Sequence, residues 1–179
     1  MVGKDSRAEA FNMNQLIRPV VLLLAFVAFC AASVAQDEPK KKAPRRFGYE
    51  VDEETYPQQT PEKAMKAIAT ALERKKVDYL LAHIADPNYV DYWVDRYKVD
   101  FPQGKEDGKR LLAFDRLVGE TNLYFQNDPL ILKDLRIFAK EAKWAEEGGL
   151  ATGTVETIPA RKVYLRKIGD RWFLENKQQ

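Results

Sequence analysis

The sequence predicts an α+β domain in which N-terminal helices pack on one face of a curved C-terminal antiparallel sheet. Between residues 60 and 140 apolar side chains recur with the helical period, and cap-then-proline pairs mark several helix starts. From Lys143 onward that period disappears, and short alternating segments are separated by turn residues. The last of these segments, residues 162–175, predicts a hairpin with one strongly apolar side that the preceding helices would cover.

Residues 1–35 predict a secretory signal peptide. The uncharged run from Pro19 to Ala35 follows Arg18, and Ser33 and Ala35 place small residues at the usual positions before a cut after Ala35. Met13 is a natural start for such a signal. We therefore expect a bacterial protein that is secreted or periplasmic. An uncleaved N-terminal membrane anchor is the alternative, because about 17 apolar residues is the lower limit for spanning a bilayer.

Residues 36–59 predict a disordered, charged linker. An acidic block at residues 50–54 follows a basic one, and neither block has the apolar side chains needed to build a core. One interpretation is a solvated tether, and the other is transient contact with an anionic membrane surface, which would suit a surface-associating structural protein. The basic residues available for that contact are Lys40, Lys41, Lys42, Arg45 and Arg46.

Three helices are predicted from the same start signal, a capping side chain followed by proline at the first helical position. The signal occurs at Thr60-Pro61, Asp86-Pro87 and Asp128-Pro129. A second helix is expected to end near Asp86, and a fourth to run from about Glu106 to Val118. The inward stripes of the second to fifth helices are then Val77, Leu80, Leu81 and Ile84; Val90, Trp93, Val94 and Tyr97; Leu111, Phe114 and Val118; and Ile131, Leu132, Leu135 and Phe138.

The C-terminal region predicts a meander of short strands. Gly148-Gly149 separates residues 143–147 from residues 150–157, and Ile158-Pro159 separates these from the final pair. A two-residue loop at Gly169-Asp170 would fix the register of that pair. This loop places Leu165 opposite Leu174 and Lys167 opposite Trp172, with Val163, Leu165, Trp172 and Leu174 on one face.

The Thr60-Pro61-Glu62 helix start, the short second helix and the terminal YLRKIGDRWFLEN resemble the nuclear transport factor two-like superfamily, which includes SnoaL-like and ketosteroid-isomerase-like proteins. The resemblance covers residues 60–84 and 143–176. It implies a cone-like fold for a single domain at residues 60–177. Because some relatives of this fold are isomerases or cyclases, it also implies a small cone-pocket enzyme with acid-base chemistry as one alternative function.

Composition excludes several classes of protein. The net charge of +2 is nearly balanced, so no overall field favours nucleic acid as a partner. The only cysteine, Cys30, lies in the apolar N-terminal run, and the chain has one histidine, so we expect neither thiol chemistry nor a metal site. Residues 104–109 contain glycines without the spacing of a phosphate or dinucleotide loop, and we expect no cofactor.

His83 is the natural acid-base candidate, because an imidazole titrates near neutral pH. With Asp86 as the group that orients it, and Tyr89 as a further polar group, His83 would form the catalytic set of an enzyme. The competing interpretation is an imidazole at a helix C-terminus, where it meets exposed carbonyl groups and the helix dipole.

Tyr89, Tyr92, Trp93 and Tyr97 form an aromatic cluster on the third predicted helix. Amphipathic rings suit a ligand pocket, although such a cluster also occurs as core and rim. The sequence thus predicts an exported, non-catalytic module that binds a ligand or interacts with a protein. The sequence does not identify the ligand or protein partner. A homodimer is one of the assemblies compatible with this prediction. The enzyme and the surface-associating protein are the alternatives.

Overall fold

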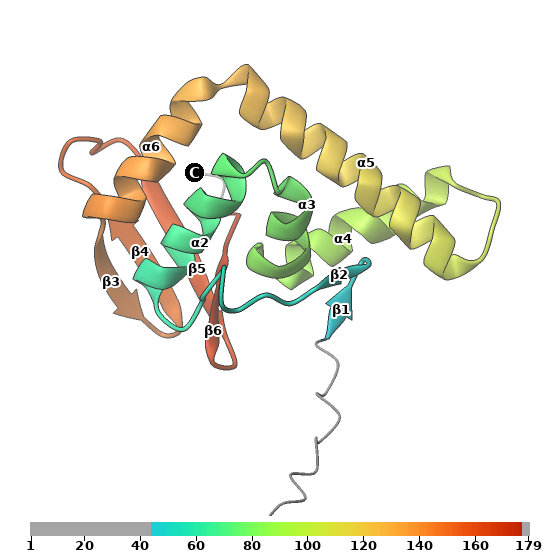
Figure 1. Ribbon diagram of the computed structural model, residues 1–179, viewed down its shortest axis with the longest axis horizontal. Helices are drawn as coiled ribbons and strands as arrows, with labels where there is room; N and C mark the ends of the chain where they lie inside the picture. Colours follow the sequence, from blue (N-terminus) through green and yellow to red (C-terminus); the bar gives the residue numbers. More distant parts are fainter. Residues whose placement is uncertain (1–43, 177–179) are drawn as a thin grey trace, which may run out of the picture. The chain divides into compact units, whose positions relative to one another are not determined.

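A computed structural model of the chain describes residues 44–176. In this part of the chain the helices precede a four-stranded antiparallel sheet, which confirms the predicted α+β class (Figure 1). The predicted signal peptide at residues 1–35, with its start at Met13, lies outside the described residues, as does the predicted linker up to residue 43. None of the helices described is long and apolar enough to cross a membrane.

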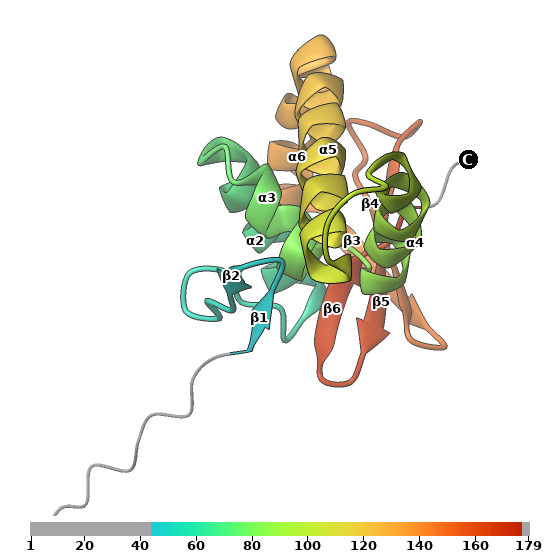
Figure 2. The ribbon, with the colours of Figure 1, turned by 90° about the vertical axis from the view of Figure 1, so that its right-hand side faces the viewer.

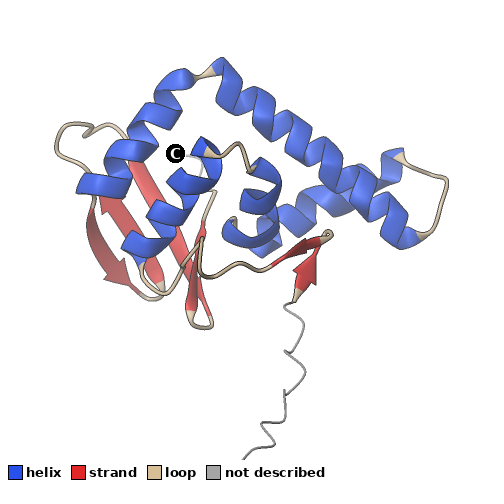
Figure 3. Cartoon of the chain, in the orientation of Figure 1, coloured by secondary structure: helices blue, strands red, loops and turns tan. Residues whose placement is uncertain are grey.

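After a short hairpin, the helices follow one another from residue 61 to residue 141, and the strands of the main sheet come last (Figure 3). The helical elements are α2 (Pro61–Glu73), α3 (Val77–Tyr79), η2 (Leu80–Ile84), α4 (Pro87–Tyr97), η3 (Lys98–Asp100), α5 (Glu106–Asn127) and α6 (Pro129–Glu141). The strands are β1 (Arg45–Arg46), β2 (Tyr49–Glu50), β3 (Lys143–Glu147), β4 (Leu150–Thr154), β5 (Lys162–Ile168) and β6 (Arg171–Leu174).

All three predicted cap-then-proline starts are present. The Thr60 hydroxyl accepts a hydrogen bond from the Lys63 amide at 3.3 Å and caps α2. Carboxylates cap the other two helices, with Asp86 at the start of α4 and Asp128 at the start of α6. These side chains replace the hydrogen bonds that the first turn of a helix cannot make for itself.

The second and fourth predicted helices differ from the structure. After the single turn of α3, the chain widens into the π-helix η2, where the Ala85 amide donates to the Leu80 carbonyl at 2.7 Å. This wider turn brings Ala85 beside Leu174, where the two residues form a parallel bridge along the edge of β6. Helix α5 continues to Asn127 instead of ending at Val118, because no proline interrupts it before Asp128-Pro129.

The inward face predicted for the fourth helix is also partly wrong. Leu111 is exposed, whereas Ala113, Phe114 and Leu117 are buried. The reason is that α5 packs against α3 and α4 and not on the sheet, so a different stripe of the helix faces the core.

The main sheet has the order β3-β4-β5-β6, as expected for a meander. The predicted register of the last hairpin is confirmed, since Leu165 pairs with Leu174 and Lys167 with Trp172. Leu165 and Trp172 are almost fully buried on the face that α2 and α6 cover (Figure 1, Figure 2). The hydrophobic core therefore includes the layer between these helices and the sheet, and it extends to the buried residues of η2, α4 and α5.

The predicted linker at residues 36–59 is wrong for the part that the structure describes. β1 and β2 form a hairpin, so folded structure is already present upstream of Thr60, where the prediction placed the start of the domain. Phe47 and Gly48 make the two-residue loop with φ of 51° and 87°, as a type I′ turn requires. Further along, Gln58 is 1% exposed, and its backbone carbonyl accepts a hydrogen bond from the Trp172 amide at 2.8 Å. This segment thus completes the core and protects the edge of β6.

Candidate functional site

A cavity of about 620 Å³ lies between α4, α5 and the end of β6. Three of the four predicted ligand-binding aromatics, Tyr89, Trp93 and Tyr97, line it because a spacing of four residues places them on one face of α4. Tyr92 is 59% exposed and does not line it. The other lining residues come from η2 and the segment after it, from α5 and from the chain end: Leu80, Leu81, Ala85, Leu117, Glu120, Thr121, Tyr124, Phe125, Leu174, Glu175 and Asn176.

The aromatic side chains on α4 form a continuous wall. The ring centroid of Trp93 lies 5.4 Å from that of Tyr97 and 6.4 Å from that of Tyr89. All three rings are partly buried and pack against the hydrophobic core, which fixes their orientation. Tyr124 of α5 adds a fourth ring to the lining and is 60% exposed. The cavity therefore presents several π faces at one opening.

A polar cluster joins α4 to α5 at this cavity. The Tyr97 hydroxyl donates a hydrogen bond to Oε2 of Glu120 at 2.5 Å, and Arg116 donates to Oε1 at 2.9 Å. Burial, followed by the hydrogen bond to Glu120, raises the pKa of Tyr97 to about 12. The same hydrogen bond, with help from Arg116, lowers the pKa of Glu120. At neutral pH the pair is therefore a neutral phenol and an ionised carboxylate.

Glu175 supplies a second carboxylate to the lining. Its Oε1 is 2.5 Å from Nη2 of Arg166, whereas its Oε2 is buried and has no hydrogen-bond partner among the described residues. A buried carboxylate oxygen without a donor is unusual, because losing water without replacement costs free energy. Of the side chains that the structure describes, these two carboxylates are the only charged ones in the lining of this cavity.

His83 lies in η2 and Asp86 caps α4, and the two side chains have different partners. Nε2 of His83 is 2.8 Å from the Tyr49 carbonyl oxygen, whereas the Asp86 carboxylate accepts from the Asn88 amide. Neither residue lines the cavity, so the structure does not join the predicted catalytic set of His83, Asp86 and Tyr89. Burial, with Arg171 and Arg46 nearby, lowers the pKa of His83. The imidazole does meet a carbonyl group, but one from the β1–β2 hairpin and not from a helix end.

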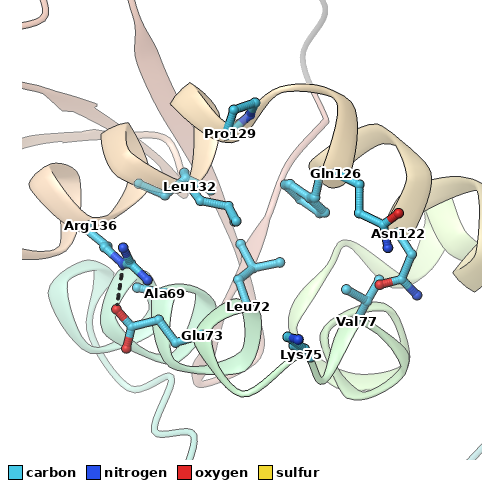
Figure 4. A pocket seen from close by; sticks show the side chains of 12 residues that line it. Ala69, Leu72, Glu73, Lys75, Val77, Asn122, Gln126, Pro129, Leu132 and Arg136 are labelled. Carbon is cyan, nitrogen blue, oxygen red and sulfur yellow. Dashed lines mark hydrogen bonds and ion pairs between the residues drawn. The ribbon is translucent and has the colours of Figure 1, made fainter.

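A second cavity of about 560 Å³ lies between α2, α3, α5 and α6 (Figure 4). Leu72 and Leu132 point into it from α2 and α6, while Glu73 and Arg136 form an ion pair of 2.8 Å at one side of it. Phe125 lines both cavities. The sequence prediction missed this second cavity, because its apolar residues occupy the stripes expected to fill the core. Its charges are of both signs, so it shows no preference for a charged ligand.

The basic block predicted to contact a membrane surface is partly engaged within the domain. Arg46 donates hydrogen bonds to the carbonyl oxygens of Ala82 and Pro87 and lies 3.0 Å from the Asp91 carboxylate. Arg45 pairs with Glu50 across the hairpin. Lys40, Lys41 and Lys42 lie outside the described residues.

Within residues 44–176, no group of three or more histidine, cysteine, aspartate or glutamate side chains is arranged to hold a metal ion. Comparison with family models, with curated proteins and with solved structures found no match for the chain. The resemblance to the nuclear transport factor two-like superfamily therefore stays a prediction.

Proposed function

We propose that the protein is an exported, non-catalytic binding module that holds a small amphipathic ligand in the cavity lined by α4, α5 and the end of β6. The observation that carries the proposal is that Tyr89, Trp93 and Tyr97 line one cavity together. Ligand pockets typically measure roughly 300–1,000 Å³ and combine an apolar lining with a few placed polar groups. This cavity has that size and that composition. Export rests on the predicted signal peptide.

The polar groups of the cavity support binding more than catalysis. A general acid or base works best when its pKa lies near the operating pH. The pKa of Tyr97 is raised to about 12 and that of Glu120 is lowered, so neither group is suited to proton transfer at neutral pH. The only histidine is buried outside the cavity, where it is bonded to the hairpin.

An apolar fluorescent probe tests the proposal. We expect N-phenyl-1-naphthylamine to bind the purified protein saturably, with a rise in its emission and a change in tryptophan fluorescence. Replacing Tyr89 by Ser removes one ring from the cavity wall, and we expect it to weaken binding at least several-fold. Leu132→Ala is the matched control, because Leu132 lines only the second cavity.

The control also decides between the two cavities. If Leu132→Ala weakens binding of the probe while Tyr89→Ser does not, the binding site is the second cavity and the proposal is wrong. Absence of saturable binding by the folded protein would equally contradict it. Thermal unfolding of both variants checks that the fold is kept.

A further inference from the structure

Among residues 44–176, the lining of the aromatic cavity has charge of one sign only. Glu120 and Glu175 are its charged residues, and its other polar lining side chains are hydroxyl and amide groups. The cavity thus places negative charge beside aromatic rings, whose faces are themselves electron-rich. Such a combination attracts cations and disfavours anions.

The two arginines that pair with Glu120 and Glu175 do not cancel this charge. Arg116 is shared between Glu120 and Asp100, at 2.9 Å and 2.6 Å. Arg166 is shared between Glu175 and Asp86, at 2.5 Å and 3.7 Å. Each arginine faces two carboxylates, so each cluster keeps an excess of negative charge at neutral pH.

Two of the rings in the cavity wall already bind cations of the protein itself. The guanidinium carbon of Arg116 lies 4.3 Å from the ring centroid of Tyr97, and that of Arg96 lies 5.9 Å from the ring of Trp93. Each ring has two faces, and one arginine covers only one of them. Both distances from guanidinium carbon to ring centroid are within the range of cation–π attraction.

Glu175 is the second observation that points to a ligand. Arg166 satisfies one oxygen of its carboxylate, and the other oxygen is buried with no donor among the described residues. A positively charged group in the cavity would compensate this oxygen electrostatically, and no side chain among the described residues donates a hydrogen bond to it.

We infer that the ligand of this cavity is an organic cation, namely a substituted ammonium group attached to an apolar body. The inference rests on the proposed binding function and adds the chemical class of the ligand. The ammonium group lies against the rings of Tyr89, Trp93 and Tyr97, near the carboxylates of Glu120 and Glu175. The apolar body packs on the leucine and phenylalanine side chains of the lining.

Choline and its uncharged isostere 3,3-dimethylbutan-1-ol test the inference, because the two have the same shape and differ in charge. Tryptophan fluorescence and NMR shifts report their binding to the folded protein. At low salt we expect choline to bind about tenfold more tightly than its uncharged isostere, because only choline gains the cation–π and charge–charge attraction. Glu175→Gln keeps the shape of the side chain, and we expect it to remove most of this advantage.

Glu73→Gln is the matched control, because it neutralises a carboxylate that lines only the second cavity. It should leave choline binding unchanged, and an equal loss in both variants would overturn the inference. Equal binding of choline and its isostere would also overturn it, while leaving the proposed function intact. The same holds if neither binds but the naphthylamine probe does. If none of the three ligands binds, both proposals are wrong.

Discussion

The ring of Phe47 stacks on the ring of Phe114, with the centroids 4.2 Å apart and the planes inclined by 9°. Phe114 is fully buried in α5, whereas Phe47 lies at the tip of the β1–β2 hairpin. Phe47 has a φ of 51°, which bulky side chains rarely adopt. This aromatic contact compensates an unfavourable backbone conformation at Phe47, and it acts together with the hydrogen bonds of Arg46 and of the Tyr49 carbonyl to hold the hairpin on the domain.

We expect Phe47→Ala to lower the free energy of unfolding by about 2 kcal/mol, because it removes a partly buried ring and its stacking while keeping the strained turn. Phe47→Asn should cost less, since asparagine tolerates positive φ. Urea unfolding measures both. Leu123→Ala is the control, because Leu123 is exposed on α5 and its truncation is expected to change stability by less than about 0.5 kcal/mol. An unchanged midpoint for Phe47→Ala would show that the hairpin does not contribute to stability.

His83 predicts a pH dependence of stability. Its pKa in the folded protein is lowered from 6.5, first by burial and then by Arg171 and Arg46. The unfolded chain therefore binds a proton at a higher pH than the folded protein does. The His83 contribution to stability is complete above pH 6.5 and falls as the pH drops toward the lowered pKa.

Urea unfolding between pH 8 and pH 5 measures this contribution when the protein is compared with His83→Gln. The amide of glutamine can still donate to the Tyr49 carbonyl but does not titrate in this range. Below pH 6.5 we expect the free energy of unfolding of the unsubstituted protein to fall relative to that of His83→Gln. Parallel curves would contradict the sign of the shift.

The last hairpin could be predicted from the sequence because local chemistry determines it. Gly169-Asp170 allows a two-residue loop, and such a loop leaves one register for Leu165 and Trp172. The capped helix starts are predictable for the same reason, since each depends on neighbouring residues. Tyr89, Trp93 and Tyr97 could be placed together because four-residue spacing puts side chains on one helix face.

The rest depends on contacts between distant segments. The charged residues around Phe47 and Tyr56 led to the prediction of a disordered linker. The rings of these two residues stack on Phe114 of α5 and Tyr79 of α3, which are distant in the sequence. Glu120 and Glu175 carry no sequence signal of a site, and they meet Tyr97 at one cavity only after the chain has folded. The separation of His83 from Asp86 follows from the hairpin, which supplies the Tyr49 carbonyl.

Gly153 and Trp144 pair across β3 and β4, and the indole lies over the glycine. A Cβ atom at Gly153 would lie 2.8 Å from two carbons of the Trp144 ring. We expect Gly153→Ala to destabilise the protein by about 1–3 kcal/mol, because the partly buried ring must move. The same substitution at Gly119 meets no neighbouring atom within 4 Å and lies inside α5. Gly119→Ala should therefore stabilise by up to about 1 kcal/mol, and equal effects at both positions in thermal unfolding would contradict the steric argument.

Gln58 binds β6 with both its backbone and its side chain. Its Nε2 donates to the Trp172 carbonyl oxygen at 2.8 Å, and its Oε1 accepts a hydrogen bond from Arg171. Gln58→Ala leaves the Trp172 carbonyl oxygen without this donor and removes one acceptor from Arg171, which keeps its hydrogen bond to the His83 carbonyl oxygen. We expect the buried carbonyl without a donor to cost about 1–3 kcal/mol. Gln59→Ala is the matched control, because the neighbouring side chain is exposed. Hydrogen exchange tests whether Gln58 protects the edge of β6. Gln58→Ala should speed exchange of the Trp172 amide more than exchange of the amides between β4 and β5. A uniform change across the sheet would contradict this role.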